Sequence, residues 1–192
     1  MAFANTQQTI EEQYLALDAA SDEKLELHNG EIIAMAGAKK NHVRITDNIS
    51  GLFYVGLRGT GCTYYSQDMR VRISKETYYY PDVVVVCGNE DILNETDLYN
   101  PTVIIEVLSD STKGIDSSEK AANYRQLPSL QAYVLVSTKG ALVTLSTRIG
   151  DSWSLQDIMG LQNQVTIESL GLSLALADIY ENVDFAKSEA EK

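Results

Sequence analysis

Two short runs of β-branched residues limit what this chain can fold into. The first is VVVV at residues 83–86, and the second is TVIIEVL at residues 102–108, which a proline precedes. Short aliphatic runs that are rich in valine and isoleucine and bounded by turn-forming residues are typical of buried strands. We therefore expect both runs to form buried strands.

Signals for a helix and a hairpin precede these runs. The segment TIEE at residues 9–12 is a capping-box pattern, and it predicts a short helix over residues 11–20. The dipeptide NG at residues 29–30 separates two apolar runs and predicts a two-residue hairpin turn. That turn places Glu26 beside His28, on the face opposite the main apolar side of the hairpin.

The rest of the chain alternates between helical and extended patterns. Asn41 is expected to cap a helix that continues to residue 58. From residue 67 the pattern has period two, which predicts a strand with two different faces. The inward residues are Met69, Val71 and Ile73, and the outward residues are Asp68, Arg70 and Arg72. Later segments predict a strand at residues 77–88 and a polar connection to residue 100. Residues 109–128 are then expected to form a loop followed by a helix, which Pro128 closes. A strand at residues 130–138, further strands and a terminal helical turn follow.

This order of elements predicts one α/β domain over residues 1–192. We expect a central mixed β-sheet flanked by helices, with an N-terminal helix and a β-hairpin. The core is expected at about residues 24–137, and C-terminal strands with an acidic tail at residues 138–192.

Composition narrows the class of protein. The net charge is −12 at pH 7, and residues 151–192 carry eight acids and two bases. Such acidity argues against a protein that coats nucleic acid, because phosphate binding needs basic surface. The N-terminus lacks the pattern of a signal peptide, and no apolar run approaches the ~20 residues of a membrane span. We expect a cytoplasmic protein without a membrane partner.

The cysteines and histidines do not have the spacing of a zinc site. Cys62 and Cys87 lie far apart and form no CxxC pattern, and the chain has two histidines, His28 and His42. A disulfide is possible, but a cytoplasmic chain of this size does not require one. We expect both cysteines to be buried strand residues.

Glu106 interrupts the second aliphatic run and therefore needs an explanation. An ionised carboxylate in a buried strand costs several kcal/mol unless it is paired or bound to a cation. Asp82 opens the VVVV strand 24 positions earlier. Two neighbouring antiparallel strands would bring these carboxylates together, where a divalent cation would relieve their repulsion. Alternatively, Asp82 caps backbone donors at a strand start and Glu106 lies on a wet edge strand.

A lysine follows on the next predicted helix. Asp116, Lys120 and Tyr124 are spaced by four residues and share one helical face. If that helix crosses the end of the sheet that carries the carboxylates, Lys120 could reach a bound water or a phosphate. The alternative is a surface salt bridge with aromatic cover.

Together these residues resemble the Uma-two family, a branch of the PD-(D/E)XK or restriction-endonuclease-like superfamily. The segments that carry the resemblance are Tyr80-Pro81-Asp82, Ile105-Glu106-Val107-Leu108-Ser109, and Asp116 with Lys120 and Tyr124. Leu25-Glu26-Leu27, Asn29-Gly30-Glu31, His42 and the strand around Tyr133 match as well. The resemblance runs from about Glu11 to Val136.

The resemblance implies a restriction-endonuclease-like core in which Asp82 and Glu106 bind Mg²⁺, with Mn²⁺ as a possible substitute. It assigns the catalytic lysine to Lys120, because Leu108 occupies the position where the superfamily usually has it. The upstream acid of the superfamily corresponds to Glu26, less directly to Glu31. Ser137 departs from an aspartate that is common in the family.

The implied function is metal-assisted hydrolysis of phosphodiester bonds in DNA by an endonuclease, expected as a homodimer because two related sites cut both strands of a duplex. Because the chain is acidic, tight binding of a DNA duplex would require basic residues around the cleft, namely Lys39, Lys40, Arg44, Arg70 and Arg72. Such groups are usually part of the solvated surface. Two alternatives stay open: a catalytically inactive nuclease-like module for protein interaction or regulation, and a hydrolase of small phosphoesters. The tyrosines at 78–80 are expected to serve structure rather than base stacking.

Overall fold

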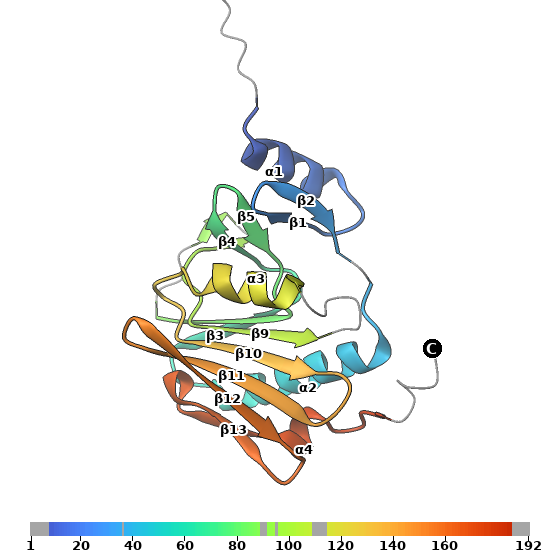
Figure 1. Ribbon diagram of the computed structural model, residues 1–192, viewed down its shortest axis with the longest axis vertical. Helices are drawn as coiled ribbons and strands as arrows, with labels where there is room; N and C mark the ends of the chain where they lie inside the picture. Colours follow the sequence, from blue (N-terminus) through green and yellow to red (C-terminus); the bar gives the residue numbers. More distant parts are fainter. Residues whose placement is uncertain (1–7, 36, 89–91, 95, 109–114, 186–192) are drawn as a thin grey trace, which may run out of the picture.

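The structure is a computed structural model that describes residues 8–35, 37–88, 92–94, 96–108 and 115–185, with no side-chain description for residues 92–94 and 115–117. Its elements form a mixed α/β arrangement with layered sheets and helices (Figure 1). None of the helices in these ranges is long and apolar enough to cross a membrane.

The first sheet carries the N-terminal hairpin. Its strand order is β2-β1-β5-β4-β8-β7. The strands are β1 (Leu25–His28), β2 (Glu31–Ala34), β4 (Arg70–Ser74), β5 (Thr77–Tyr79), β7 (Ile92–Asn94) and β8 (Asp97–Leu98). Strands β4 and β8 run parallel, whereas the other neighbours are antiparallel.

The second sheet carries both aliphatic runs. Its strand order is β12-β11-β10-β9-β6-β3. The strands are β3 (Cys62–Ser66), β6 (Val83–Cys87), β9 (Val103–Leu108), β10 (Ala132–Ser137), β11 (Leu142–Ile149) and β12 (Ser152–Met159). Strands β9 and β10 are parallel and the remaining pairs are antiparallel, so the expected mixed sheet is confirmed.

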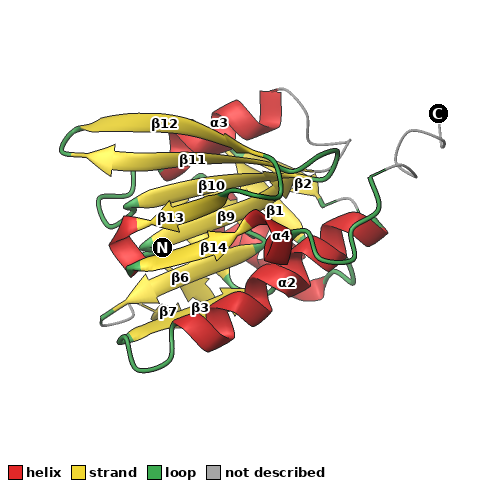
Figure 2. Cartoon of the chain, turned by 90° about the horizontal axis from the view of Figure 1, so that it is seen from below, coloured by secondary structure: helices red, strands yellow, loops and turns green. Residues whose placement is uncertain are grey.

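Helices cover the second sheet on both faces. The helix α3 (Ile115–Tyr124) lies between the two sheets, beside β9 and β10 (Figure 1). The opposite face is covered by α2 (Lys40–Gly56) and α4 (Leu176–Ile179), which lie side by side (Figure 2). The hairpin of β13 (Gln164–Ile167) and β14 (Leu172–Ala175), joined by the 3-10 turn η2 (Glu168–Leu170), completes that layer, and α1 (Ile10–Ala20) packs on β1.

Alternation along β6 and β9 divides the core into two parts. Val83 and Val85 pack with the α2 layer, whereas Val84 packs with Ala121 and Tyr124 of α3. The same alternation in β9 sends its odd-numbered residues toward α2 and Ile104 toward α3. Both aliphatic runs are thus buried on both faces, as expected.

The N-terminal signals are confirmed. Thr9 and Glu12 make the reciprocal hydrogen bonds of a capping box at the start of α1. The hairpin register pairs His28 with Glu31 and Glu26 with Ile33. The predicted type of turn is observed, because Asn29 and Gly30 both have positive φ angles, of 49° and 92°.

Two predicted boundaries are wrong. Residues 77–88 do not form one strand, because the chain leaves the first sheet after β5 and enters the second at β6. Proline interrupts the ladder there, since it has no N–H to donate. The helix α2 begins at Lys40, not after Asn41, whose side chain instead donates to the carbonyl of Asp184.

The prediction for Arg70 is also wrong. Its side chain is 8% exposed, and it contacts Asp97 at 2.5 Å and Asp18 at 2.6 Å. The alternation rule assumed solvent on that face, but α1 packs there and supplies Asp18. Arg72 is half-buried and paired with Glu11 at 2.8 Å. Neither arginine is therefore placed to frame a cleft.

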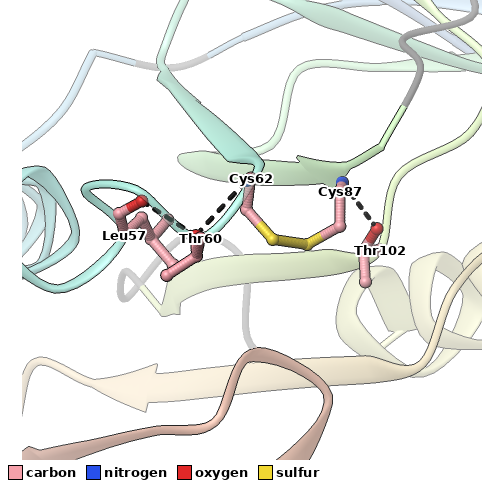
Figure 3. The surroundings of a disulfide bond; sticks show 5 residues. All are labelled: Leu57, Thr60, Cys62, Cys87 and Thr102. Carbon is pink, nitrogen blue, oxygen red and sulfur yellow. Dashed lines mark hydrogen bonds between the residues drawn. A yellow bond between two sulfur atoms is a disulfide. The ribbon is translucent and has the colours of Figure 1, made fainter.

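The two cysteines form a disulfide, contrary to the expectation of unpaired buried residues (Figure 3). Both lie on strands, as expected, but each is half-buried. The register of β3 and β6 places Cys62 directly opposite Cys87. Because the register follows from sheet pairing and not from spacing in the sequence, the pattern of cysteines alone did not reveal the bridge.

Candidate active site

Asp82 and Glu106 meet at one end of the second sheet. Strands β6 and β9 are antiparallel with Val83 opposite Ile105, so Asp82 precedes one partner and Glu106 follows the other. Alternation places both carboxylates on the sheet face that packs against α3. The prediction that the two acids lie close together is therefore confirmed. Their position alone does not assign a metal-binding role to either of them.

Asp82 is anchored through one oxygen. Its Oδ2 accepts a hydrogen bond of 2.7 Å from the backbone N–H of Val107 and lies 3.2 Å from Nε2 of His42. His42 comes from the first turn of α2 and is 14% exposed. The other ring nitrogen, Nδ1, is buried and has no hydrogen-bond partner among the described residues. Capping of a backbone donor, one of the alternatives for Asp82, is thus part of its role.

Glu106 is held from the α3 side. Its Oε1 accepts a hydrogen bond of 3.2 Å from the hydroxyl of Tyr124 and lies 4.0 Å from Nζ of Lys120. The side chain is 13% exposed. Burial raises the pKa of Glu106 to about 8, and the charges of Asp82 and Glu26 add to this effect while Lys120 opposes it. A bound cation would be the strongest means of keeping such a carboxylate ionised at neutral pH.

Glu26 is saturated by donors from the protein. Its two carboxylate oxygens contact Nε2 of His28 at 2.8 Å, the backbone N–H of Tyr80 at 2.9 Å, and Nζ of Lys120 at 2.8 Å. Burial alone would raise the pKa of Glu26, but these hydrogen bonds and the charge of Lys120 outweigh it, so its pKa is lowered. Glu26 therefore remains ionised and fixes the position of Lys120.

The hairpin turn ties β1 to α3. The side chain of Asn29 donates to Glu119 and accepts from Thr77 at 3.1 Å and from Asn123 at 3.4 Å. Asn29 thus links the strand that carries Glu26 to the helix that carries Lys120. The local turn signal in the sequence consequently positions two site residues that are far apart along the chain.

These side chains lie along a cavity of about 650 Å³. Asp82, Glu106, Glu26 and Lys120 all contribute to its lining, together with His28 and His42. Apolar residues from the hairpin, the following loop and α2 form much of the remaining wall: Ile33, Ala34, Met35, Ala38 and Val43. One part of the cavity lining is therefore charged, and another part is apolar.

The donor set fits a hard divalent cation held by two carboxylates. Asp82 Oδ1 and Glu106 Oε2 accept no hydrogen bond from the described residues, so one oxygen of each acid is available in the cavity. Within those same residues, no three His, Cys, Asp or Glu side chains gather into a metal site. Mg²⁺ commonly takes one or two carboxylates and completes its shell with water and substrate phosphate.

The other residues singled out in the sequence are placed differently. Glu31 is exposed and outside the cavity lining, whereas Leu108 and Tyr133 contribute to that lining. The side chain of Asp116 lies outside the described residues. Ser137 accepts a hydrogen bond from Lys139 in the turn after β10. Only Glu26, of the two upstream acids, therefore joins the site.

Two contacts escaped sequence reasoning. His28 was recognised as a neighbour of Glu26, but its hydrogen bond to that buried acid was not. Tyr80 supplies both a backbone donor to Glu26 and a side chain in the cavity lining. Its neighbours Tyr78 and Tyr79 are fully buried, as expected for a structural role. The proline after Tyr80 was the available signal, because it ends the strand there.

Comparison with known proteins places these features in a family. The model of the Uma2 family, described as "putative restriction endonuclease", matches residues 11–177. Two uncharacterized proteins of Synechocystis sp. are similar: sll1609 is 35% identical, covering 83% of this chain and 93% of its own, and slr1290 is 33% identical, covering 91% and 92%.

A solved structure shares the fold. It is a protein of Anabaena variabilis, described as a putative nuclease belonging to DUF820, with a TM-score of 0.74 and 16% sequence identity. The similarity covers 91% of this chain and 98% of that one. The match confirms the expected fold class, in which a nuclease-type core carries a mixed sheet flanked by helices.

Proposed function

Because this chain belongs to the Uma2 family of restriction-endonuclease-like proteins, we propose that it is a nuclease that hydrolyses phosphodiester bonds in DNA. Asp82 and Glu106 would hold Mg²⁺, and Lys120 would act on the substrate. The observation that carries the proposal is the convergence of the two carboxylates and the lysine at one cavity, with Lys120 Nζ 4.0 Å from Glu106.

When bound, the cation would supply positive charge to a phosphoryl oxygen and lower the pKa of a coordinated water. Lys120 contributes a second positive charge that is already fixed by Glu26. This ammonium would stabilise the negative charge that develops on the phosphoryl oxygens in the transition state. Hydrolysis forms one P–O bond from water and breaks the bond to the 3′ oxygen, which leaves with its electron pair and gains a proton. The products carry a 5′ phosphate and a 3′ hydroxyl.

The surrounding contacts would keep the reacting groups in place. His42 and the N–H of Val107 orient Asp82, and the hydroxyl of Tyr124 orients Glu106. These side chains are largely buried, and the lower dielectric constant around them strengthens their electrostatic interactions.

A catalytically inactive module is the main competing function. It would be favoured by a solvated Lys120, but that side chain is 12% exposed and lies in the cavity. Two contacts fit the inactive module, because they show that each acid also serves the fold: Asp82 accepts a hydrogen bond from the N–H of Val107, and Glu106 accepts one from the hydroxyl of Tyr124. The available oxygens of both acids support the nuclease instead.

Metal binding and cleavage test the proposal together. We expect saturable binding of Mn²⁺ to the wild type by isothermal titration calorimetry, and its loss in Asp82→Asn and Glu106→Gln. Asp157→Asn is the matched control, because this exposed acid lies on β12 and contacts Thr144 outside the cavity. Cleavage of DNA should require the metal and fail in the first two variants. Absence of metal binding by the wild type, even with DNA present, would favour the inactive module.

A further inference from the structure

The reacting groups are largely buried and line a recess of limited size. The side chains of Asp82, Glu106 and Lys120 are 14%, 13% and 12% exposed. A cavity of about 650 Å³ has the size of a site for one small molecule, because such sites span about 300–1,000 Å³. The recess can thus enclose a nucleotide unit but not the width of a base-paired helix.

The mouth of the recess has exposed apolar side chains. Ile33 of β2 and Val43 of α2 both line the cavity, and each is 40% exposed. Ile33 is paired with Glu26 and lies on the same face of the hairpin, so its side chain is close to the charged part of the cavity lining. An unstacked base can pack against apolar side chains while its phosphate contacts the charged groups beside them. A base that is stacked in a duplex has no free face for such packing.

The charges around the recess match one phosphate better than a duplex. Within the part of the chain that the structure describes, four acids and two lysines line it, namely Glu23, Glu26, Asp82, Glu106, Lys24 and Lys120. One divalent cation would bring this lining close to neutrality. Duplex DNA carries a phosphate charge about every 1.7 Å of its axis, and proteins that grip it present many basic groups.

The basic side chains nearby are poorly arranged for a duplex. Arg70 and Arg72 are held in ion pairs with acids. Lys39, Lys40 and Arg44 are exposed on the loop and first turns of α2, the helix that supplies Val43. They could follow the backbone of one strand along that side of the recess.

We propose that the recess admits a single unpaired nucleotide, so that the enzyme cuts single-stranded or locally unpaired DNA in preference to an intact duplex. This inference rests on the proposed nuclease function. The chemistry is the hydrolysis described above, with water adding across the bond to the 3′ oxygen. A site of this kind cuts one strand at a time, so catalysis requires no second copy of the chain.

Three substrates of one sequence test the preference. They are a labelled single strand, the same strand in a blunt duplex, and the duplex with a short central bubble, each incubated with Mn²⁺ and compared with Asp82→Asn as the blank. We expect the single strand and the bubble to be cut at least about tenfold faster than the blunt duplex, because unpairing a base costs free energy. Equal or faster cutting of the duplex overturns the inference and leaves the proposed function intact. If none of the DNA substrates is cut above the blank, the proposed function itself fails.

The apolar wall gives a second test. Ile33→Asp places a charge where the base would pack, and we expect KM for the single strand to rise about tenfold. Val43→Asp is an independent variant on a different element and should act in the same direction. Leu155→Asp is the matched control, since Leu155 is 62% exposed on β12 and outside the lining. Unchanged KM in both wall variants, with circular dichroism spectra like that of the wild type, overturns the inference.

Discussion

Replacement of Glu106 by glutamine should change how the stability of the metal-free protein depends on pH. Burial raises the pKa of Glu106 from 4.5 to about 8 in the folded state. In the unfolded chain the carboxyl regains its usual pKa near 4.5. The folded state therefore binds the proton more tightly, and the stability from this group is complete below pH ~4.5 and is lost as pH rises through about 8.

The structure also sets the size of the effect. Each unit of pKa shift corresponds to about 1.4 kcal/mol, so the rise to about 8 gives an upper limit of ~5 kcal/mol above that pH. Glutamine cannot ionise, yet it can still accept the hydrogen bond from Tyr124. Glu106→Gln should thus match the wild type near pH 4.5, exceed its stability progressively up to about pH 8, and keep a constant advantage above that pH.

Urea unfolding in the presence of EDTA at several pH values measures this difference. The comparison with the wild type cancels contributions from acids that do not interact with Glu106, whereas the interactions of Glu106 with Asp82 and Glu26 are part of the measured difference. Added Mn²⁺ should then stabilise the wild type at pH 8 and leave Glu106→Gln unchanged. A stability difference that stays constant between pH 5 and pH 9 would refute the assignment of a raised pKa to Glu106.

Three further outcomes are expected. Reduction of the Cys62–Cys87 bridge, which closes a separation of 25 residues, should lower the free energy of unfolding by about 3 kcal/mol, measured by urea unfolding with and without dithiothreitol. Asp97→Asn should cost about 2 kcal/mol, because it removes one of the two carboxylates that pair with the buried Arg70 and leaves the guanidinium with Asp18; a loss below ~1 kcal/mol in thermal unfolding would contradict this. Lys120→Gln should reduce kcat by about 100-fold while changing Mn²⁺ affinity little, and an equal loss of both would show that the lysine organises the metal ligands instead.

Local patterns in the sequence predicted the main elements near the site. The dipeptide Asn29-Gly30 determined the hairpin register, because a two-residue turn leaves little freedom in strand pairing. The aliphatic runs identified β6 and β9, and an antiparallel pairing of these strands predicted that Asp82 and Glu106 meet at one end of the sheet. These inferences succeeded because each depended on neighbours within a few residues or on one antiparallel pairing.

Contacts between distant segments were beyond such reasoning. The spacing around Lys120 predicted a shared helical face but left a surface salt bridge open, and the docking of α3 on the hairpin decided between them. Arg70 was assigned to solvent because the alternation of its strand contained no information about α1. His42 was recognised as a family position, yet its contact with Asp82 depends on how α2 lies against β6.

Backbone periodicity and turn chemistry were thus enough to predict the strands and the hairpin, and to suggest that the two acids meet where antiparallel strands pair. Which polar groups are buried, and which partner each one has, depended on how distant elements pack. The pairing of Glu26 with Lys120 joins residues 94 positions apart. Burial raises the free-energy cost of an unpaired charge, so the packing of distant elements, and not the local pattern, assigns each charged side chain its partner.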